Sequence, residues 1–258
     1  MTKKAAKDII YDEKFYRRQQ DGSYASAKCV VPIVISLFER IDSVIDFGCG
    51  MGTWLAVFQE MGVEHVTGVD GHHVDRSLLF ISPDDFVPYD LSKSIEMKKK
   101  YDLAISLEVA EHLPKSSSQV FVDSLCAHSD TVLFSAAIPR QGGTNHVNEE
   151  YPSYWAALFK TNGYLPIDCL RHRIWKDDNI KAFYRQNILI YAKETSSFYR
   201  RNASFYYNDP LDIVHPKIYD IQRPPNSLRS LLEMLLYLLK KLPIYTMRAL
   251  KRRLTKHN

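Results

Sequence analysis

Three glycines at alternate positions and one nearby acid carry the strongest chemical signal in the chain. Gly48, Gly50 and Gly52 follow a short apolar run, 44–47, that contains Asp46. Glycine accepts left-handed backbone dihedrals and allows a ligand to come very close to the main chain. The pattern therefore predicts a buried strand that breaks into a tight ligand-binding turn, with a carboxylate beside the ligand.

The spacing of these glycines distinguishes between two kinds of nucleotide ligand. A dinucleotide-binding turn has the form GxGxxG and holds a pyrophosphate, but here Thr53 occupies the place of the third glycine. The carboxylate of Asp46 would repel a pyrophosphate and would attract a cationic group. A helix is expected from Trp54 to Met61, which places the turn where open α/β sheets bind small ligands.

The segment from Asp46 to Gly52 resembles motif I of the class I S-adenosylmethionine (AdoMet) methyltransferases. The resemblance implies AdoMet as the cofactor, with the acid near its cationic methionine end. Later segments match the same family in order and imply further cofactor contacts. The implied set is Asp46, Gly48, Cys49, Gly50 and Gly52 in the turn, Asp70 and Gly71 at the ribose, Asp90 and Leu91 at the adenine, and Leu107, Glu108 and Val109 at the cofactor edge.

Ordinary alternatives remain for several of these residues. Asp46 and Asp70 could be turn or helix-cap acids, and Asp90 could equally be a turn residue. Glu108, Glu111 and His112 could simply cap and solvate a helix.

The elements that must position these residues follow an alternating pattern of strands and helices. Strands are expected at 44–47, 64–70, 85–91, 131–137, 163–169 and 187–193, and another at the start of 101–114. The fold class is therefore α/β, a Rossmann-like seven-stranded, mostly parallel sheet with helices on both faces, plus an α-helical C-terminal tail.

The N-terminal segment is rich in hydroxyls, amides and aromatic rings, with a turn expected at Asp21-Gly22. In AdoMet enzymes such a segment commonly folds over the cofactor as a lid. Tyr16, Gln20, Ser23 and Ser26 are therefore candidates to bind the methionine carboxylate of the cofactor or to gate the site. The alternative is a polar surface turn that leads into a helix.

The acceptor side should lie in the long polar loop 138–150, which follows the fifth strand. Methyl transfer to a hydroxyl requires removal of a proton, and histidine has a suitable pKa. His146 is the first candidate for the catalytic base and His112 is the second, although a lone loop histidine can also be a surface residue. The His146–Glu149 run before a Pro-Ser-Tyr-Trp helix resembles bacterial methyltransferases linked to surface polysaccharides and glycans.

No recognisable set of metal ligands is predicted from the sequence, so no metal is expected. Aromatic and basic residues are interleaved after residue 151. They could form a wall for an anionic or diphosphate-linked sugar, but also for RNA. The residues in question are Tyr154, Trp155, Trp175, Phe183, Tyr184, Arg171, Arg173, Lys176, Lys181 and Arg185.

Composition places the chain among globular enzymes. It has 258 residues, of which 45% are hydrophobic and 25% are charged, both ordinary for a folded domain. Four cysteines are far apart and the start lacks an apolar signal segment, so a cytoplasmic location is expected.

The C-terminal tail, 226–258, carries the basic charge of the chain. It holds eight Lys or Arg residues and one acid, a net charge of +7, whereas the whole chain is +4. A leucine-rich helix is expected at 227–241, then Pro243 and a shorter basic helix. This pattern favours peripheral binding to an anionic inner membrane surface. The alternatives are packing on its own domain or on a second subunit as a homo-oligomer, with nucleic acid a less favoured partner.

The expected organisation is an N-terminal lid segment at 1–30, a methyltransferase domain at 31–194, a linker or wrapping arm at 195–225 and the tail. The expected function is methyl transfer from AdoMet to a hydroxyl of a sugar or glycan precursor, the acceptor partner. The alternatives are an RNA or small-metabolite methyltransferase, or a non-catalytic AdoMet-fold module that anchors a partner.

Overall fold

The structure is a computed structural model that describes residues 13–206, 211–222, 228, 231–232 and 235, and the side chains of all of these except 13–21 and 221–222. The described residues up to Ile218 belong to one compact unit, and those from Tyr219 onward belong to another. Of the helix expected at 227–241, only 228, 231–232 and 235 are described, and these are helical. The shorter basic helix expected after Pro243 lies outside the described residues.

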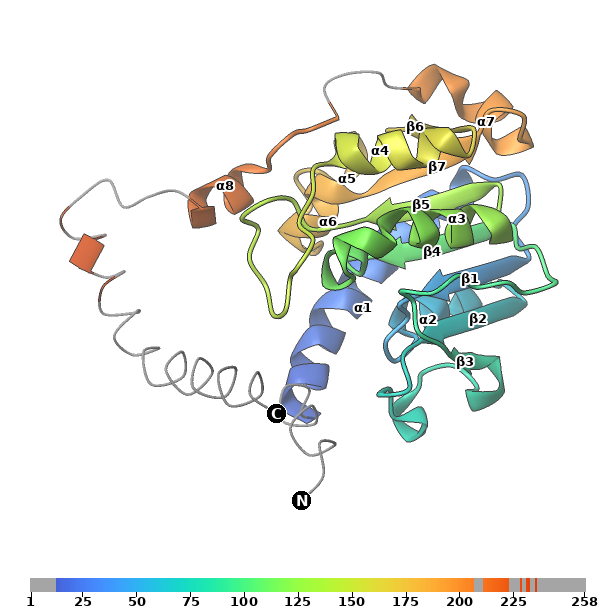
Figure 1. The fold of residues 1–258 in the computed structure, drawn as a ribbon, viewed down its shortest axis with the longest axis horizontal. Coiled ribbons are helices and arrows are strands. Elements are labelled where there is room, and N and C mark those ends of the chain that lie inside the picture. The colour runs from blue at the N-terminus through green and yellow to red at the C-terminus, as the bar shows by residue number, and fades with distance from the viewer. Residues whose placement is uncertain (1–12, 207–210, 223–227, 229–230, 233–234, 236–258) are drawn as a thin grey trace. The chain divides into compact units, whose positions relative to one another are not determined.

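A seven-stranded sheet forms the centre of the first unit (Figure 1). Its spatial order is β3-β2-β1-β4-β5-β7-β6, and only β7 runs antiparallel to its neighbours. This confirms the predicted fold class and all seven expected strands. The strands are β1 (Ser43–Phe47), β2 (His65–Asp70), β3 (Phe86–Pro88), β4 (Leu103–Leu107), β5 (Thr131–Ser135), β6 (Tyr164–Ile167) and β7 (Leu189–Lys193).

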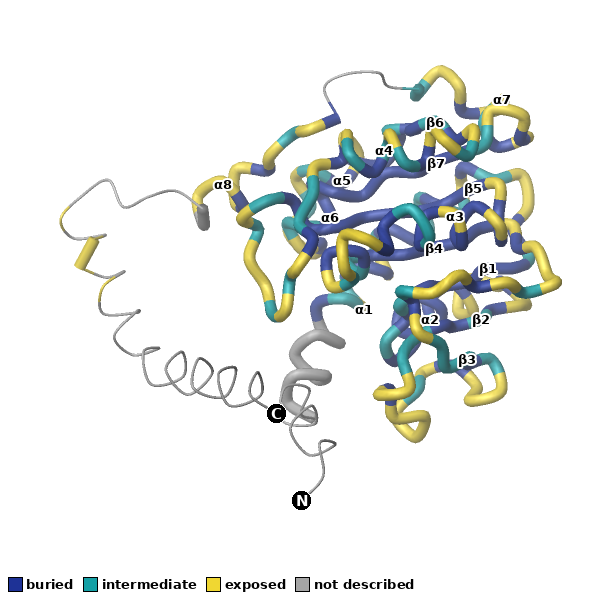
Figure 2. The backbone as a smooth tube through the Cα atoms, viewed as in Figure 1, coloured by how far each residue is buried: buried dark blue, intermediate teal, exposed yellow. Residues whose placement is uncertain are grey.

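Helices cover both faces of the sheet, so its central strands are buried on both sides (Figure 2). One core contains Leu55 and Val44, and the other contains Phe121 and Ile45. Adjacent strand residues thus enter opposite cores, as the pleat of a strand requires. The first core is covered by α1 (Glu13–Ser36), α2 (Thr53–Glu60) and α6 (Ala182–Asn187), and the second by α3 (Ser118–His128) and α4 (Pro152–Thr161).

The expected turn at Asp21-Gly22 is wrong, because α1 is one continuous helix through these residues. A Cβ at Gly22 would lie 2.1 Å from Cε of Lys181. The glycine therefore permits the close approach of another segment, and local propensity for a turn is overridden by packing.

The segment expected to be a linker or wrapping arm packs on the domain. It contains α7 (Ser197–Asn202) and α8 (Pro216–Gln222), and α5 (Arg171–Ile174) lies before it in the chain. Phe198, Asn202, Leu211 and His215 are all buried. These residues therefore belong to the same compact unit as the sheet, and the bounds of the expected segment stay a prediction.

The strand order reverses direction at β1 and β4, which are adjacent at the centre of the sheet. From β1 the chain proceeds to β2 and β3 on one side, and from β4 to β5 on the other. The crevice outside the carboxyl ends of such strands is where open α/β sheets bind ligands.

Candidate active site

A cavity of about 490 Å³ lies at the carboxyl ends of β1 and β4. One wall comes from the glycine turn after β1, and another from the residues that follow β4. The loop after β5 and the segment before and within α6 complete it. The lining includes Ser23, Asp46, Gly48, Cys49, Gly50, Met51, Thr53, Trp54, Leu107, Glu108, Val109, Glu111, His112, Gln141, Gly142, Gly143, Thr144, His146, Lys181, Phe183 and Tyr184.

The glycine turn needs glycine for two different reasons. Gly48 has φ +93°, and a Cβ there would lie 2.3 Å from the side chain of Val109. Gly50 has φ +54°, and a Cβ there would meet nothing within 4 Å. Gly48 therefore allows the two walls to pack, whereas Gly50 leaves open space at the backbone. This is the cradle that the sequence predicted.

Asp46 presents a buried carboxylate to the cavity. Its side chain is only 4% exposed, and none of the described residues forms a hydrogen bond or ion pair with it. Burial, and then the negative charge of Asp70, raise the pKa of this carboxyl well above its usual value. A cationic group in the cavity would stabilise the ionised form. The site therefore fits the ammonium group of a bound amino acid moiety.

Asp70 holds the turn in place from the end of β2. Its Oδ2 accepts a hydrogen bond from the Gly50 amide at 2.8 Å, and its Oδ1 accepts one from the Gly71 amide at 2.6 Å. Neither Asp70 nor Gly71 lines the cavity. The ribose role of Asp70 stays a prediction, and the structure adds a role in fixing the loop that contains Gly50.

Asp90 and Leu91 lie just beyond β3 and also outside the cavity lining. Asp90 is exposed and accepts hydrogen bonds from the amide and hydroxyl of Ser92, at 3.0 and 2.7 Å. Leu91 is buried in the core with Ile45. The adenine role predicted for this pair stays a prediction, and the contacts of Asp90 are those of a turn.

Leu107, Glu108 and Val109 line the cavity at the end of β4, and their contact with the cofactor stays a prediction. Glu108 has φ +58°, which is strained for a residue other than glycine. Its half-buried carboxylate accepts hydrogen bonds from Gln141 at 2.7 Å and from Asn187 at 3.1 Å. Burial raises the pKa of Glu108, and these two amides oppose that rise. The sequence did not indicate either amide, because both are distant in the chain.

The predicted lid residues divide into three cases. The side chains of Tyr16 and Gln20 lie outside the described residues. Ser26 is fully buried and does not line the cavity, because its hydroxyl donates to the Gly22 carbonyl and accepts from the Lys181 amide. Ser23 does line the cavity, and its hydroxyl lies 3.4 Å from that of Tyr184.

The loop after β5 uses each residue of its His-Val-Asn-Glu run differently. His146 enters the cavity, whereas Val147 is 65% exposed. Asn148 is buried and donates to the Ser118 hydroxyl at 3.0 Å. Glu149 accepts from the Arg140 and Gly142 amides at 2.7 and 3.1 Å. The run therefore anchors the loop and delivers one histidine to the cavity.

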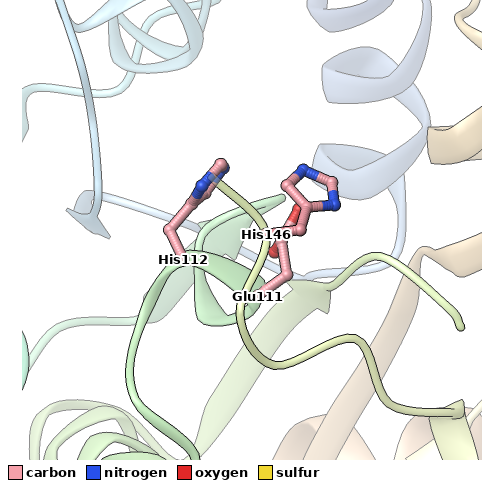
Figure 3. A group of neighbouring side chains, drawn as sticks. All are labelled: Glu111, His112 and His146. Atoms are coloured by element: carbon pink, nitrogen blue, oxygen red, sulfur yellow. The ribbon is translucent and has the colours of Figure 1, made fainter. Parts of the chain in front are cut away.

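Both predicted base candidates lie on the same side of the cavity (Figure 3). The rings of His112 and His146 meet edge to face with centroids 4.9 Å apart. Burial, and then the neighbouring His146, lower the pKa of His112. Glu111 lies beside them and is 1% exposed. Sequence reasoning missed Glu111 as a site residue, although its position next to His112 at the end of a parallel strand was an available signal.

The predicted acceptor wall is only partly correct. Phe183, Tyr184 and Lys181 line the cavity. Trp155 is 1% exposed and packs on Phe134 in the core, so its expected place in the wall is wrong.

Two of the basic residues have structural partners instead. Arg171 is buried and pairs with Asp168 at 2.8 Å, and Arg185 is buried and pairs with Asp178 at 2.9 Å. Neither guanidinium lines the cavity.

In the second unit, the described leucines Leu228, Leu231, Leu232 and Leu235 are exposed. Within the part of the chain that the structure describes, no helix has the length and apolar character needed to cross a bilayer.

Comparison with known proteins identifies the family. The model of a family described as "Methyltransferase domain" matches residues 16–172, which is more than half of the chain. A search of curated proteins found no match.

Solved structures share the fold. The sugar N-methyltransferase KedS8 from Streptoalloteichus sp. ATCC 53650 has a TM-score of 0.53 and 13% identity over 70% of this chain and 92% of its own. CalS10, an amino pentose methyltransferase from Micromonospora echinaspora, has a TM-score of 0.50 and 12% identity over 71% and 98%. The magnesium protoporphyrin IX methyltransferase ChlM from Synechocystis PCC 6803, with bound SAH, has a TM-score of 0.50 and 18% identity over 68% and 86%.

The glycine cradle and the acid beneath it thus stand in a fold shared with methyltransferases, and the matched family model covers most of the residues that build the cavity. The chain belongs to the methyltransferase domain family and is a methyltransferase that uses S-adenosylmethionine as its cofactor.

Proposed function

We propose that this enzyme transfers a methyl group from AdoMet to a hydroxyl of a sugar or glycan precursor. One observation carries the proposal: the glycine cradle with Asp46 and the histidine pair His112 and His146 face into one cavity. The cradle suits the cofactor and the histidines suit an acceptor that must lose a proton. A cofactor and a hydroxyl acceptor could therefore meet in the same space.

In the cofactor half, Asp46 would hold the amino group of the methionine moiety through its carboxylate. Gly50 would let the backbone approach the cofactor, while Asp70 keeps the turn in position through the Gly50 amide. When bound, AdoMet supplies the methyl group, which bonds to the acceptor oxygen as the carbon–sulfur bond breaks and its electron pair returns to sulfur. The main contribution of the protein is to align the two reactants.

In the acceptor half, His146 is the proposed base, with His112 the second candidate. Nδ1 of His146 is bound to Glu149 at 2.9 Å, so Nε2 is the nitrogen that could take the hydroxyl proton. The carboxylate of Glu149 would stabilise the imidazolium that results. Both histidines line the cavity, where His146 is half-buried and His112 is more exposed.

Two features support a sugar as the acceptor. Phe183 and Tyr184 place aromatic side chains in the cavity wall, and sugar rings pack well on aromatic faces. Lys181 adds a cation suited to a phosphate-linked sugar. The names of KedS8 and CalS10 refer to sugar methylation, although their identity to this chain is too low to transfer a substrate.

A methyl-transfer assay tests the proposal directly. The full chain is incubated with isotopically labelled AdoMet and separate acceptor panels: nucleotide-linked sugars, lipid-linked sugars, short RNAs and small hydroxylated metabolites. Mass spectrometry then locates the label. We expect label on a sugar hydroxyl, whereas label on RNA or on a metabolite without a sugar would overturn the proposed acceptor class.

We also propose that the tail, 226–258, brings the enzyme to an anionic membrane surface. Its net charge of +7 and its exposed leucines support this location. A membrane surface would place the enzyme beside lipid-linked sugar acceptors.

A further inference from the structure

Three potential metal ligands meet on the acceptor side of the cavity. Glu111 and His112 lie in a short 3-10 turn, Ala110–His112, just after β4, and His146 comes from the loop after β5. One ligand atom of each lies within 4.8 Å of the others, and Figure 3 shows the three side chains converging. All three residues line the cavity.

Among the described residues, Glu111 has no side-chain partner that explains its burial. It is 1% exposed, and neither carboxylate oxygen meets the geometry of a hydrogen bond within the described part of the chain. Burial raises the pKa of this carboxyl well above its usual value and outweighs the backbone amides of Glu111 and Ala137, which lower it. The amides of Val147 and Asn148 donate to its backbone carbonyl, at 2.8 and 3.1 Å, and not to its side chain. Buried carboxylates are costly unless they are paired or coordinate a metal. The fold thus fixes the Glu111 backbone and leaves the carboxylate available inside the cavity.

His146 is oriented in the manner of a metal ligand. Its Nδ1 is bound to Glu149 at 2.9 Å, which leaves Nε2 free of that contact. Metal-binding histidines almost always donate their second nitrogen to a carboxylate, a carbonyl or water. Glu149 is itself held by the Arg140 and Gly142 amides. The loop therefore supplies both a ligand and the group that positions it.

Glu108 does not belong to this ligand set, although it is only three residues from Glu111. Each of its carboxylate oxygens already accepts a hydrogen bond from a side-chain amide, that of Asn187 or Gln141. The two acids therefore have different tasks: Glu108 joins three segments of the chain, and Glu111 remains open. A site of three protein ligands keeps at least one coordination position for an exogenous oxygen.

We propose that Glu111, His112 and His146 bind one divalent transition-metal cation, of the class represented by Mn²⁺ and Zn²⁺. Two imidazoles and one carboxylate favour such ions over Mg²⁺, which prefers oxygen ligands. Metal bonds of about 2.0–2.2 Å would bring the ligand atoms to roughly 3–3.5 Å from one another. The side chains must therefore close in by about an ångström, which torsion changes in three separate side chains can supply.

The role of the ion rests on the proposed hydroxyl acceptor, whereas its binding does not. An acceptor oxygen in the open position would have its hydroxyl pKa lowered by the cation. The proton would then leave to water, and the alkoxide would form the new bond to the methyl carbon. In the loaded enzyme His146 is a ligand, so the ion replaces it as the group that acidifies the acceptor.

The test is metal binding by the full, tag-free chain after dialysis against a chelator. Mn²⁺ is titrated and followed by electron paramagnetic resonance and calorimetry, with Zn²⁺ and Mg²⁺ in parallel. We expect one saturable Mn²⁺ site per chain, bound more tightly than Mg²⁺. Glu111→Gln, His112→Ala and His146→Ala should each lose at least tenfold in Mn²⁺ affinity, and Glu149→Gln should lose roughly 10–100-fold.

His65→Ala is the matched control, because His65 is exposed on β2, outside the cavity. It should bind Mn²⁺ as the parent chain does. Binding of S-adenosylhomocysteine by every variant shows that the fold is retained.

Absence of saturable binding, equal Mn²⁺ affinity in Glu111→Gln, or tighter binding of Mg²⁺ would overturn the metal site. Transfer to a sugar hydroxyl that persists in chelator would then leave the proposed function standing. If Mn²⁺ binds as expected but no methyl group is transferred to any hydroxyl, the proposed acceptor class is wrong and the proposed metal site still stands.

Discussion

Nδ1 of His146 lies 2.9 Å from Oε1 of Glu149, three residues later in the same loop. A carboxylate can only accept, so Nδ1 carries a proton, and in the neutral imidazole the lone pair is on Nε2. The same carboxylate binds the Arg140 and Gly142 amides. The fold thus fixes both the tautomer and the position of the histidine that faces the acceptor.

Removal of this imidazole should stop chemistry and spare cofactor binding. We expect His146→Ala to lower turnover by ~10²-fold or more, because it removes either a general base, which contributes about that much, or a ligand of the proposed cation. Affinity for S-adenosylhomocysteine, measured by calorimetry, should stay nearly unchanged. Full turnover in His146→Ala together with a loss in His112→Ala would move the role to His112.

The Asp46 carboxylate should lower the stability of the ligand-free enzyme and raise its affinity for the cofactor. Asp46→Asn removes the charge that attracts the cofactor ammonium, so we expect binding of S-adenosylhomocysteine to weaken by about 1–3 kcal/mol. Asp84→Asn, an exposed acid outside the cavity, is the control. Calorimetry that shows parental affinity in Asp46→Asn would remove the cofactor argument from motif I.

The same acid should shape the pH dependence of stability in the ligand-free enzyme. Burial raises the pKa of Asp46 above 3.8, the value of an unperturbed carboxyl. The folded state therefore binds this proton more tightly than the unfolded state, and stability declines as pH rises from that value through the folded pKa. At neutral pH, Asp46→Asn should melt above the parent chain, and the gap should narrow in acid. Melting curves across pH check this, and a gap that widens in acid would contradict it.

The glycine turn allows packing and ligand approach to be tested separately. Gly48→Ala should destabilise the fold by on the order of 2–5 kcal/mol, because it clashes with Val109 and is strained at φ +93°. Gly50→Ala should cost only about 1–2 kcal/mol but should weaken cofactor binding, because its methyl group enters the cradle.

Gly62→Ala is the matched control for Gly50→Ala. Gly62 also has positive φ, and a Cβ there meets nothing within 4 Å, but it lies after α2 and away from the cavity. Both variants should lose similar stability in chemical denaturation. Equal cofactor affinity in the two would show that the Gly50 cradle is not the binding site.

The tail should govern membrane association. A chain truncated after Pro225 should stay folded and bind S-adenosylhomocysteine, but lose the sedimentation with anionic liposomes that the full chain shows. Each basic residue near such a surface contributes ~1 kcal/mol, screened by salt. Added salt should therefore weaken liposome binding, and the binding that remains at high salt should come from the leucine side chains. A full chain that ignores liposomes, yet loses dimerisation or thermal stability when truncated, would make the tail a packing element.

The sequence by itself determined the sheet and the cofactor half of the site. Buried parallel strands are continuous apolar runs, and Asp46 with its three following glycines forms a contiguous local signal. Such features depend only on residues that are close together in the chain, so residue type and spacing are sufficient to predict them. The structure accordingly has the glycine turn and brings Leu107–Val109 and His146 to one cavity, while the roles of these residues stay predictions.

Only the tertiary structure decided how distant residues share the acceptor half. Glu108 meets Gln141, and Glu111 meets His146, because β4 and β5 are adjacent parallel strands whose carboxyl ends coincide. Asn187 reaches Glu108 from the end of α6, because β7 begins there and runs antiparallel to β5. Gly22 lies within a helix and not in a turn, and its missing side chain makes room for Lys181. These relationships depend on strand order and packing, which local periodicity does not encode.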